Sequence, residues 1–277
     1  MNEPEIDAEI VHHYEHDYDE AARITSGLNE LELLRTREVI ERVLPGDALR
    51  ILDAGGAAGV HARWLAQAGH QVEIIDLMPR HVEAAAALAE QGLAVTARLG
   101  DARSLPHADQ EFDAVLLLGP LYHLVERDDR VQAWREALRV VKPGGFVFAA
   151  GVNRFASLFS GLAHGVFLDP RFRAIVERDL NDGQHRNPDR EPNWFTTAYF
   201  HHPDELGAEA TEAGASVMET IGVEGLACWL PQLESQWNDP DGREAILDSA
   251  RVIESEPTLR GLSAHLITVA RRPELTG

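Results

Sequence analysis

An acid followed at once by a cluster of glycines is the stretch of this 277-residue chain whose chemistry is clearest. The apolar run from Leu49 to Leu52 ends at Asp53, and three glycines follow it, at Gly55, Gly56 and Gly59. Beyond them, apolar residues recur at helical spacing. Glycines let a ligand approach the backbone closely, and the first turn of a helix presents unpaired N–H groups. The pattern predicts a strand, a tight turn and a helix that cradle a nucleotide-like ligand.

A second acid, Asp76, ends the next apolar strand, Gln71 to Ile75. A carboxylate at this distance, about 20 residues after the glycines, accepts hydrogen bonds from ribose hydroxyls in nucleotide-binding folds. Both dinucleotides and S-adenosylmethionine fit this arrangement. The dinucleotide pattern G-x-G-x-x-G fails here, because neither its third nor its sixth place, Ala57 and Val60, holds a glycine.

Histidines supply the candidate acid–base groups. His123 follows the fourth predicted strand, at the edge where open α/β sheets bind ligands, so we expect it to act as a base, with Tyr122 beside it. A histidine at this point can equally cap a helix or bond backbone. His12, His13 and His16 form no closed ligand set with a cysteine, and we expect no metal there or elsewhere.

Aromatic and polar residues late in the chain and near its start are candidates for contact with the substrate. Those in or near the region 152–200 are Arg154, Trp194, Tyr199, His201 and, further on, Trp229. Tyr14 and Tyr18 belong to an N-terminal segment that could close over the site. The aromatic side chains suit an apolar or aromatic substrate, although burial in the core explains each of them as well.

The elements that must position these residues alternate between strands and helices. Strands are expected at 49–52, 71–75, 94–99, 112–118, 146–150, 215–223 and 263–270, and helices at 60–68, 78–91, 128–140, 202–213 and within 231–260. Such alternation indicates an α/β fold, a doubly wound and mostly parallel sheet with helices on both faces. The turn Lys142-Pro143-Gly144-Gly145 should precede the fifth strand.

We expect one domain over residues 1–277, since this length suits a single large domain with an insertion. Residues 1–44 would form an N-terminal helical lid, and 45–151 the half that binds the cofactor. Residues 152–200 break the alternation and predict an inserted helical cap, because an unstructured loop of that length is rare in a compact domain. Residues 201–277 would complete the sheet.

Composition narrows the possible partners and location. The net charge of −21 repels phosphate backbones, so we expect no nucleic acid partner. No apolar stretch reaches the roughly 18 residues that span a bilayer, and the acidic start is unlike a secretion signal. One cysteine, Cys228, excludes an internal disulfide, and the cytoplasm is the expected setting. Monomer and homodimer both remain open.

Taken together, these motifs resemble the class I S-adenosylmethionine-dependent methyltransferases, over roughly residues 35 to 270. Asp53, Gly55 and Gly59 match the family pattern D/E-x-G-x-G-x-G, in which Ala57 replaces the middle glycine. The resemblance implies the strand order 3-2-1-4-5-7-6 and S-adenosylmethionine as cofactor, with S-adenosylhomocysteine as product.

The resemblance also implies roles for single residues. Asp76 would hold the ribose and Leu77 would pack on the adenine, whose amino group would bond the acid of Gly100-Asp101-Ala102. Leu118-Gly119 would face the methionine part of the cofactor, and Arg35 would form bidentate hydrogen bonds to the carboxylate of that part.

The expected reaction is methyl transfer to an oxygen or nitrogen of a small molecule, by in-line displacement that depends mainly on proximity and orientation. Two alternatives remain open at this point. One is a protein that binds S-adenosylmethionine without transfer. The other, a nicotinamide-dependent oxidoreductase, lacks the dinucleotide glycines, and Lys142 as the only lysine leaves no Tyr-x-x-x-Lys pair.

Overall fold

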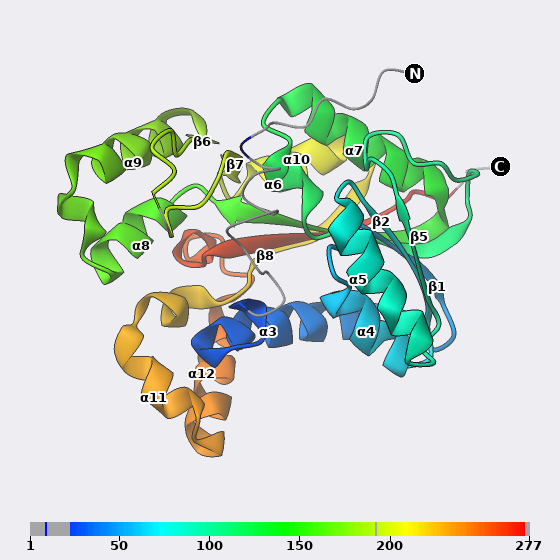
Figure 1. Cartoon of the computed structure of the whole chain (residues 1–277), viewed down its shortest axis with the longest axis horizontal. Helices are drawn as coiled ribbons and strands as arrows, with labels where there is room; N and C mark the ends of the chain where they lie inside the picture. Colours follow the sequence, from blue (N-terminus) through cyan, green and yellow to red (C-terminus); the bar gives the residue numbers. More distant parts are fainter. Residues whose placement is uncertain (1–8, 10–22, 192, 275–277) are drawn as a thin grey trace.

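A single twisted sheet with helices on both faces forms the centre of the molecule (Figure 1). The computed structural model describes residue 9 and residues 23–191 and 193–274. Its seven main strands lie in the order β3-β2-β1-β4-β5-β9-β8. They are β1 (Arg50–Ala54), β2 (Gln71–Asp76), β3 (Val95–Leu99), β4 (Phe112–Leu117), β5 (Val141–Asn153), β8 (Ser216–Gly222) and β9 (His265–Arg271).

The direction of these strands confirms the expected topology. The first five are parallel, and β9 inserts antiparallel between β5 and β8. Counted in chain order, the seven strands have the order 3-2-1-4-5-7-6 that the family resemblance implied.

Two short strands that the sequence did not predict make the sheet larger and more mixed than expected. They are β6 (Gln184–His185) and β7 (Ala198–His201). The end of β5 runs past the other strands and pairs with β7 in parallel, Val152 opposite Phe200. The start of β5 also differs, because residues 142–145 lie within this strand and not ahead of it, with Gly144 at φ +74° in an irregular register beside β4.

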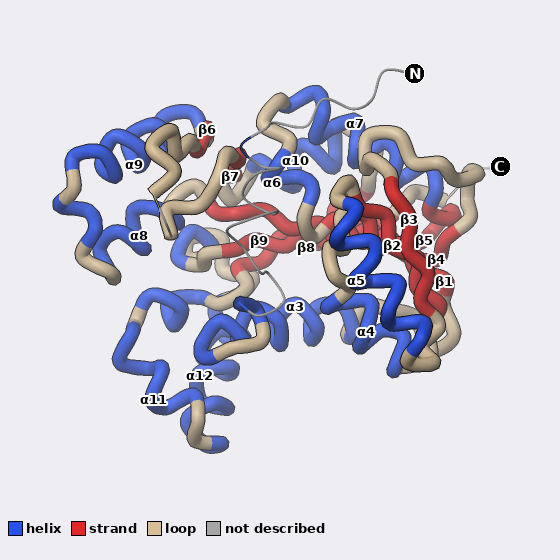
Figure 2. The backbone as a smooth tube through the Cα atoms, in the orientation of Figure 1, coloured by secondary structure: helices blue, strands red, loops and turns tan. Residues whose placement is uncertain are grey.

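Helices cover the sheet in two layers, each with its own apolar core (Figure 2). On one face α3 (Glu30–Glu41), α4 (Val60–Gln67) and α5 (Pro79–Glu90) pack with residues such as Ile40, Leu65 and Leu88. On the other, α7 (Arg127–Val140) and α10 (Glu205–Glu212) pack through Trp134 and Leu206. The near-continuous apolar β4 is buried on both sides, as its sequence predicts.

The remaining helices lie around the carboxyl edge of the sheet and beside α3. The short α6 (Pro120–His123) follows β4, while α8 (Ala156–Ala163) and α9 (Pro170–Asp182) occupy the predicted cap region. The helices α11 (Glu234–Trp237) and α12 (Pro240–Ile253) pack on α3 through Trp237 and Leu31. Short 3₁₀ turns span Gly27–Asn29, Val166–Leu168, Gly225–Trp229, Pro231–Leu233 and Arg260–Leu262. No described helix combines the length and apolar character needed to cross a membrane.

Candidate active site

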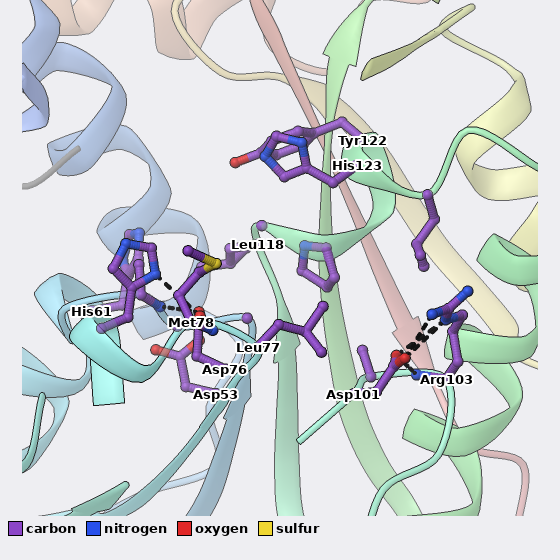
Figure 3. A pocket seen from close by; sticks show the side chains of 18 of the residues that line it. Asp53, His61, Asp76, Leu77, Met78, Asp101, Arg103, Leu118, Tyr122 and His123 are labelled. Carbon is purple, nitrogen blue, oxygen red and sulfur yellow. Dashed lines mark hydrogen bonds and ion pairs between the residues drawn. The ribbon is translucent and has the colours of Figure 1, made fainter. Parts of the chain in front are cut away.

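A cavity of about 730 Å³ opens at the carboxyl ends of β1, β2 and β4, where the sequence predicted the ligand (Figure 3). This is the edge at which open α/β sheets bind ligands, because the loops of neighbouring strands diverge there. Asp53 and Asp76 lie on one side of the cavity, Asp101 on the other, and Tyr122 and His123 lie over Leu118. The predicted cofactor residues that line it are Asp53, Gly55, Gly56, Ala57, Asp76, Leu77, Asp101, Ala102, Leu118 and Gly119.

The glycine turn brings the loops after β1 and β4 into backbone contact. A Cβ at Gly119 would lie 2.7 Å from the carbonyl oxygen of Gly55, and one at Gly56 would lie 2.6 Å from the carboxyl carbon of Asp53. Both positions therefore require glycine. Ala57, which replaces a family glycine, adopts φ +46°, a region that side chains disfavour, and its N–H donates to Asp76 at 3.0 Å.

Asp53 is almost fully buried beneath this turn, and neither of its carboxylate oxygens has a hydrogen-bond partner among the described residues. Burial, together with repulsion from the Asp76 carboxylate, raises the pKa of Asp53 to about 7. A buried acid of this kind favours a cationic ligand group, which would supply the missing partner.

Asp76 is fixed by three donors. Its oxygens accept hydrogen bonds from the backbone N–H groups of Ala57 and Met78, at 3.0 and 2.9 Å, and lie 3.1 Å from Nδ1 of His81. These contacts hold one carboxylate at the mouth of the glycine turn. It still has acceptor capacity for ligand hydroxyls, since an ionised carboxylate offers about four lone-pair sites.

Asp101 is held by a neighbouring arginine. The guanidinium of Arg103 donates to both Asp101 oxygens, at 2.7 to 3.2 Å, and reaches Asp129 at 2.7 Å. All three residues line the cavity, so this wall carries two carboxylates and one guanidinium.

A second, smaller cavity of about 200 Å³ adjoins the first. The two share Glu32, His61, Leu118 and Tyr122 in their linings. The rest of its lining combines aliphatic, aromatic and polar side chains; it includes Phe195, Phe200, Arg23, Thr36 and His265. A small molecule in the second cavity would therefore lie directly beside a ligand in the first.

The helix α6 carries Tyr122 and His123 into the larger cavity. Their rings lie 4.6 Å apart between centroids, and Phe195 stacks on His123 at 6.1 Å. Tyr122 separates the two cavities and His123 faces the larger one.

Three predicted cofactor residues lie behind the larger cavity and not in its lining. Gly59 precedes α4 at φ +81°, where a Cβ would lie 2.8 Å from Leu88, and Gly100 packs against Ile75. Arg35 is buried on α3, where its guanidinium pairs with Glu38 and Glu254 and is 3.4 Å from the carbonyl of Val223. These partners turn Arg35 away from the cavity, so the expected carboxylate bond is not supported.

The predicted substrate residues at 154–229 also lie outside the linings of both cavities, and each contacts other parts of the fold. Arg154 donates to Glu205, whose carboxylate also accepts the Tyr199 hydroxyl, and His201 is fully buried beside Glu209. The ring of Trp194 packs on Phe172, and Trp229 donates to the carbonyl of Leu262. Tyr14, Tyr18, His12, His13 and His16 fall outside the described residues.

Several lining residues went unnoticed in the sequence, five of them with side chains that bear on the site's chemistry. His61 and His81 stand in the first turns of the helices after β1 and β2, a position that could have identified them. Arg103 stands two residues after Asp101, an equally visible signal. Glu32 and His265 carry no such signal, since only the tertiary fold places α3 against the start of β9.

His265 pairs with the buried Glu224 and lies 3.7 Å from Glu32. Burial alone would lower the pKa of His265, but the two carboxylates outweigh it and raise that pKa to about 9. The lining of the second cavity thus includes two members of a charged cluster, Glu32 and His265.

An open α/β sheet, a glycine turn over a buried acid and two further acids on successive strands define an enzyme that binds a nucleoside cofactor of the S-adenosylmethionine kind. Comparison with known proteins agrees with this. Residues 51–145 match the model of a methyltransferase domain. The chain is 38% identical over 117 residues to the ubiquinone biosynthesis O-methyltransferase of Methylocella silvestris, covering 42% of this chain and 44% of that one. It is 30% identical to the enzyme of that name from Stutzerimonas stutzeri, covering 71% of this chain and 76% of that one.

Solved structures share the fold at low sequence identity. A methyltransferase from Methanosarcina mazei superposes with a TM-score of 0.58 at 16% identity, covering 85% of this chain and 97% of that one. The cyclase SpnF gives a TM-score of 0.55 at 22% identity, covering 88% and 81%. The chain belongs to the class I S-adenosylmethionine-dependent methyltransferases, and S-adenosylmethionine is its methyl donor.

Proposed function

We propose that this enzyme methylates an oxygen nucleophile of a small molecule that binds in the second cavity. The observation that carries the proposal is the junction of the two cavities at Leu118 and Tyr122. A methyl group delivered from the larger cavity has to pass to an acceptor in line with the bond that breaks, so donor and acceptor sites must adjoin.

The residues of the larger cavity fit the cofactor. Asp53, whose buried oxygens have no described partner, is matched by the ammonium of the methionine part. Asp76 suits the ribose hydroxyls, and Leu77 and Met78 offer apolar contact to the adenine. Asp101 suits the adenine amino group, provided that one of its oxygens bonds the base while Arg103 keeps the other. The cofactor supplies a methyl group already activated by its sulfonium.

The protein's own contribution is then placement, exclusion of water and removal of a proton. Tyr122 and Phe195 wall the junction with aromatic surface, which keeps water from the reacting atoms. His123 is the proposed base, since imidazole titrates near neutrality and its ring in the larger cavity lies 4.6 Å from that of Tyr122, which also lines the second cavity.

Oxygen is preferred to nitrogen as the acceptor because the similar curated enzymes are named O-methyltransferases of ubiquinone biosynthesis. Alignments with such enzymes cover between 44% and 86% of their lengths. The aromatic side chains that line the second cavity, Tyr122, Phe195 and Phe200, also suit a phenolic ring. The cyclase SpnF shares the fold, so binding without methyl transfer stands as the alternative.

Partners and location follow from the same features. A surface of net charge −21 favours a small-molecule substrate over nucleic acid or an anionic membrane. We further propose that the enzyme is cytoplasmic. We also propose that residues 1–44 form a lid and residues 152–200 a cap on a single domain, which is either a monomer or part of a homodimer.

The test is a turnover screen that follows S-adenosylhomocysteine formation with catechols, other phenols, aliphatic alcohols and amines. We expect turnover with a phenolic compound and a mass gain of one methyl on its oxygen. The Asp76→Ala variant, which loses the ribose partner, should bind S-adenosylmethionine more weakly by more than about 1 kcal/mol and lose turnover in the screen. Tight cofactor binding with no methylated product from any class would favour the binding protein, and methylation of amines alone would overturn the choice of oxygen.

A further inference from the structure

We propose that Glu32, Glu224 and His265 bind one divalent transition-metal cation in the wall of the second cavity. The three residues come from α3, from the turn after β8 and from the first position of β9. One ligand atom from each lies within 4.8 Å of the other two. They are separated by up to 233 positions in sequence, from 32 to 265, so no local sequence pattern indicates a metal site.

The spacing of the three groups is close to what a metal requires. Nδ1 of His265 lies 2.5 Å from Oε1 of Glu224 and 3.7 Å from Oε2 of Glu32. Ligands bound at about 2.0–2.2 Å to a common ion stand roughly 3 to 3.5 Å apart. Shifts of about an ångström or less in side chains would therefore complete the site, while the backbone stays in place. Binding of the ion would release to solvent the Nδ1 proton that His265 directs at Glu224, because only a neutral imidazole nitrogen can act as a ligand.

One side of the proposed metal site is buried in the protein, and the other side faces the second cavity. Glu224 is buried, and its second oxygen accepts the backbone N–H of His265 at 3.1 Å, which fixes both ligands relative to each other. Glu32 and His265 line the second cavity, so an ion between them would face the space assigned to the acceptor. Three protein ligands with one open position are the arrangement of catalytic metal sites.

Ligand chemistry narrows the choice of ion. Carboxylate oxygens alone would suit magnesium, calcium or manganese, whereas imidazole nitrogen suits zinc, iron, copper and nickel better. Two carboxylates with one imidazole therefore favour Zn²⁺, Fe²⁺ or Mn²⁺. Arg23 donates to Oε2 of Glu32 at 2.9 Å, so the ion must share that oxygen or take the other one.

The catalytic value of such an ion rests on the proposed function. If an acceptor hydroxyl enters the second cavity, a cation there would bind its oxygen and make its proton easier to remove. Metal binding itself does not depend on this role, and it can be measured without cofactor or acceptor.

The experiment titrates Zn²⁺ and Mn²⁺ calorimetrically into the full chain after treatment with a chelator, and measures bound metal by mass spectrometry after dialysis. We expect one equivalent bound, with Mg²⁺ and Ca²⁺ at least about tenfold weaker. The isosteric variant Glu224→Gln and the variant His265→Ala should each lose more than about tenfold in affinity, since each removes a ligand.

Two control variants separate this site from others. Glu73→Gln changes a second glutamate–histidine pair, in which Glu73 lies 3.0 Å from His107. Among the described residues this pair is not part of a cluster of three possible metal ligands, so the variant should bind metal as tightly as the parent. The triple variant His12→Ala, His13→Ala, His16→Ala tests metal capture by the N-terminal histidines. Cobalt added to the unmodified protein gives a visible spectrum that reports the ligand set if a site variant folds poorly.

Three results would overturn the proposal. They are no stoichiometric binding by the unmodified chain, binding equal in Glu224→Gln and His265→Ala, and binding lost only in the triple histidine variant. Methyl transfer with no metal bound would remove the catalytic role and leave the proposed function intact.

Discussion

At the level of single residues, the folded protein disfavours the ionised form of the Asp53 carboxyl group. Its oxygens lie under the glycine turn without a described donor, and the Asp76 carboxylate stands nearby, so its pKa rises to about 7. Between its unfolded value near 4 and about 7, the folded protein keeps a proton that the unfolded chain releases. Stability of the ligand-free enzyme therefore falls as pH rises through this interval.

Asp53→Asn should remove this dependence. The variant has no proton to lose, so its gain in free energy of unfolding over the parent should be larger at pH 8 than at pH 5. It should also bind S-adenosylmethionine more weakly, because a charged partner for the cofactor ammonium is lost. Urea unfolding at both pH values, with calorimetry of the cofactor, measures the two effects. An equal effect on stability at both pH values would show that the Asp53 carboxyl is not raised in the folded state.

His123→Gln tests the proposed base. If imidazole removes the acceptor proton, kcat should fall by about 10²- to 10⁴-fold and the rise of activity with pH near neutrality should disappear. The variant keeps a polar side chain on α6, so cofactor binding should change little. If the variant's kcat has the same pH profile as the parent's, His123 only lines the cavity, and proximity of donor and acceptor is enough for methyl transfer.

Sequence could identify residues that follow strands but not those that meet through tertiary packing. Asp53, Asp76 and Asp101 were predicted because each ends or follows an apolar run at the carboxyl edge. Arg35 remains a prediction as a cofactor residue, and its helical position could not reveal Glu254, its partner on the segment after α12. The residues Glu32, Glu224 and His265 come from three separate segments of the chain, so no local sequence pattern predicts that they form a cluster.

At the level of elements, the placement of α6 depends on a buried ion pair. Arg130 of α7 and Glu209 of α10 lie 2.8 Å apart and are both almost fully buried. The same guanidinium donates to the carbonyls of Leu124 and Val125, at 2.9 Å each, and both residues line the larger cavity just after α6. One arginine thus ties two helices to the loop that carries the site.

Arg130→Met should therefore damage stability and binding together. Breaking this buried pair leaves Glu209 with His201 as its remaining described partner, at a cost of about 3–5 kcal/mol, and frees the loop at 124–125. The double variant Arg130→Met, Glu209→Met should recover much of the stability but not the KM for the cofactor, because the loop contacts stay lost. Urea unfolding and steady-state kinetics test both. Full recovery of KM in the double variant would mean that Arg130 does not position the loop.

The sequence predicted the strands whose burial on both faces produces a continuous apolar run. It did not predict several elements of two to four residues. The strands β1 to β4 match their apolar runs to within about two residues. The strands β6 and β7 have two and four residues and exist only because β5 extends far enough to pair with Phe200. The four-residue α6 is too short for any helical period to show.

At the level of the whole molecule, the larger cavity joins segments from widely separated parts of the chain. Its lining runs from Ile24 and Glu32 to Asp129, across the loops after four parallel strands and against α3. A ligand that contacts all of these segments binds the folded chain and not the unfolded one, and so stabilises the entire fold by mass action.

S-adenosylhomocysteine at about 100 times its dissociation constant should therefore raise the free energy of unfolding by about 2.7 kcal/mol. For a chain of this size the melting temperature should rise by roughly 5 to 10 °C. NAD at the same concentration should have no effect, because the turn lacks the dinucleotide glycines and Ala57 adds a side chain there. Thermal melts at several ligand concentrations measure both. The Glu73→Gln variant, changed outside the cavity, should show the full shift, and Asp76→Ala a smaller one. A shift with NAD that equals the shift with S-adenosylhomocysteine would mean that the cavity recognises an adenosine in general and that the methionine end adds nothing to binding.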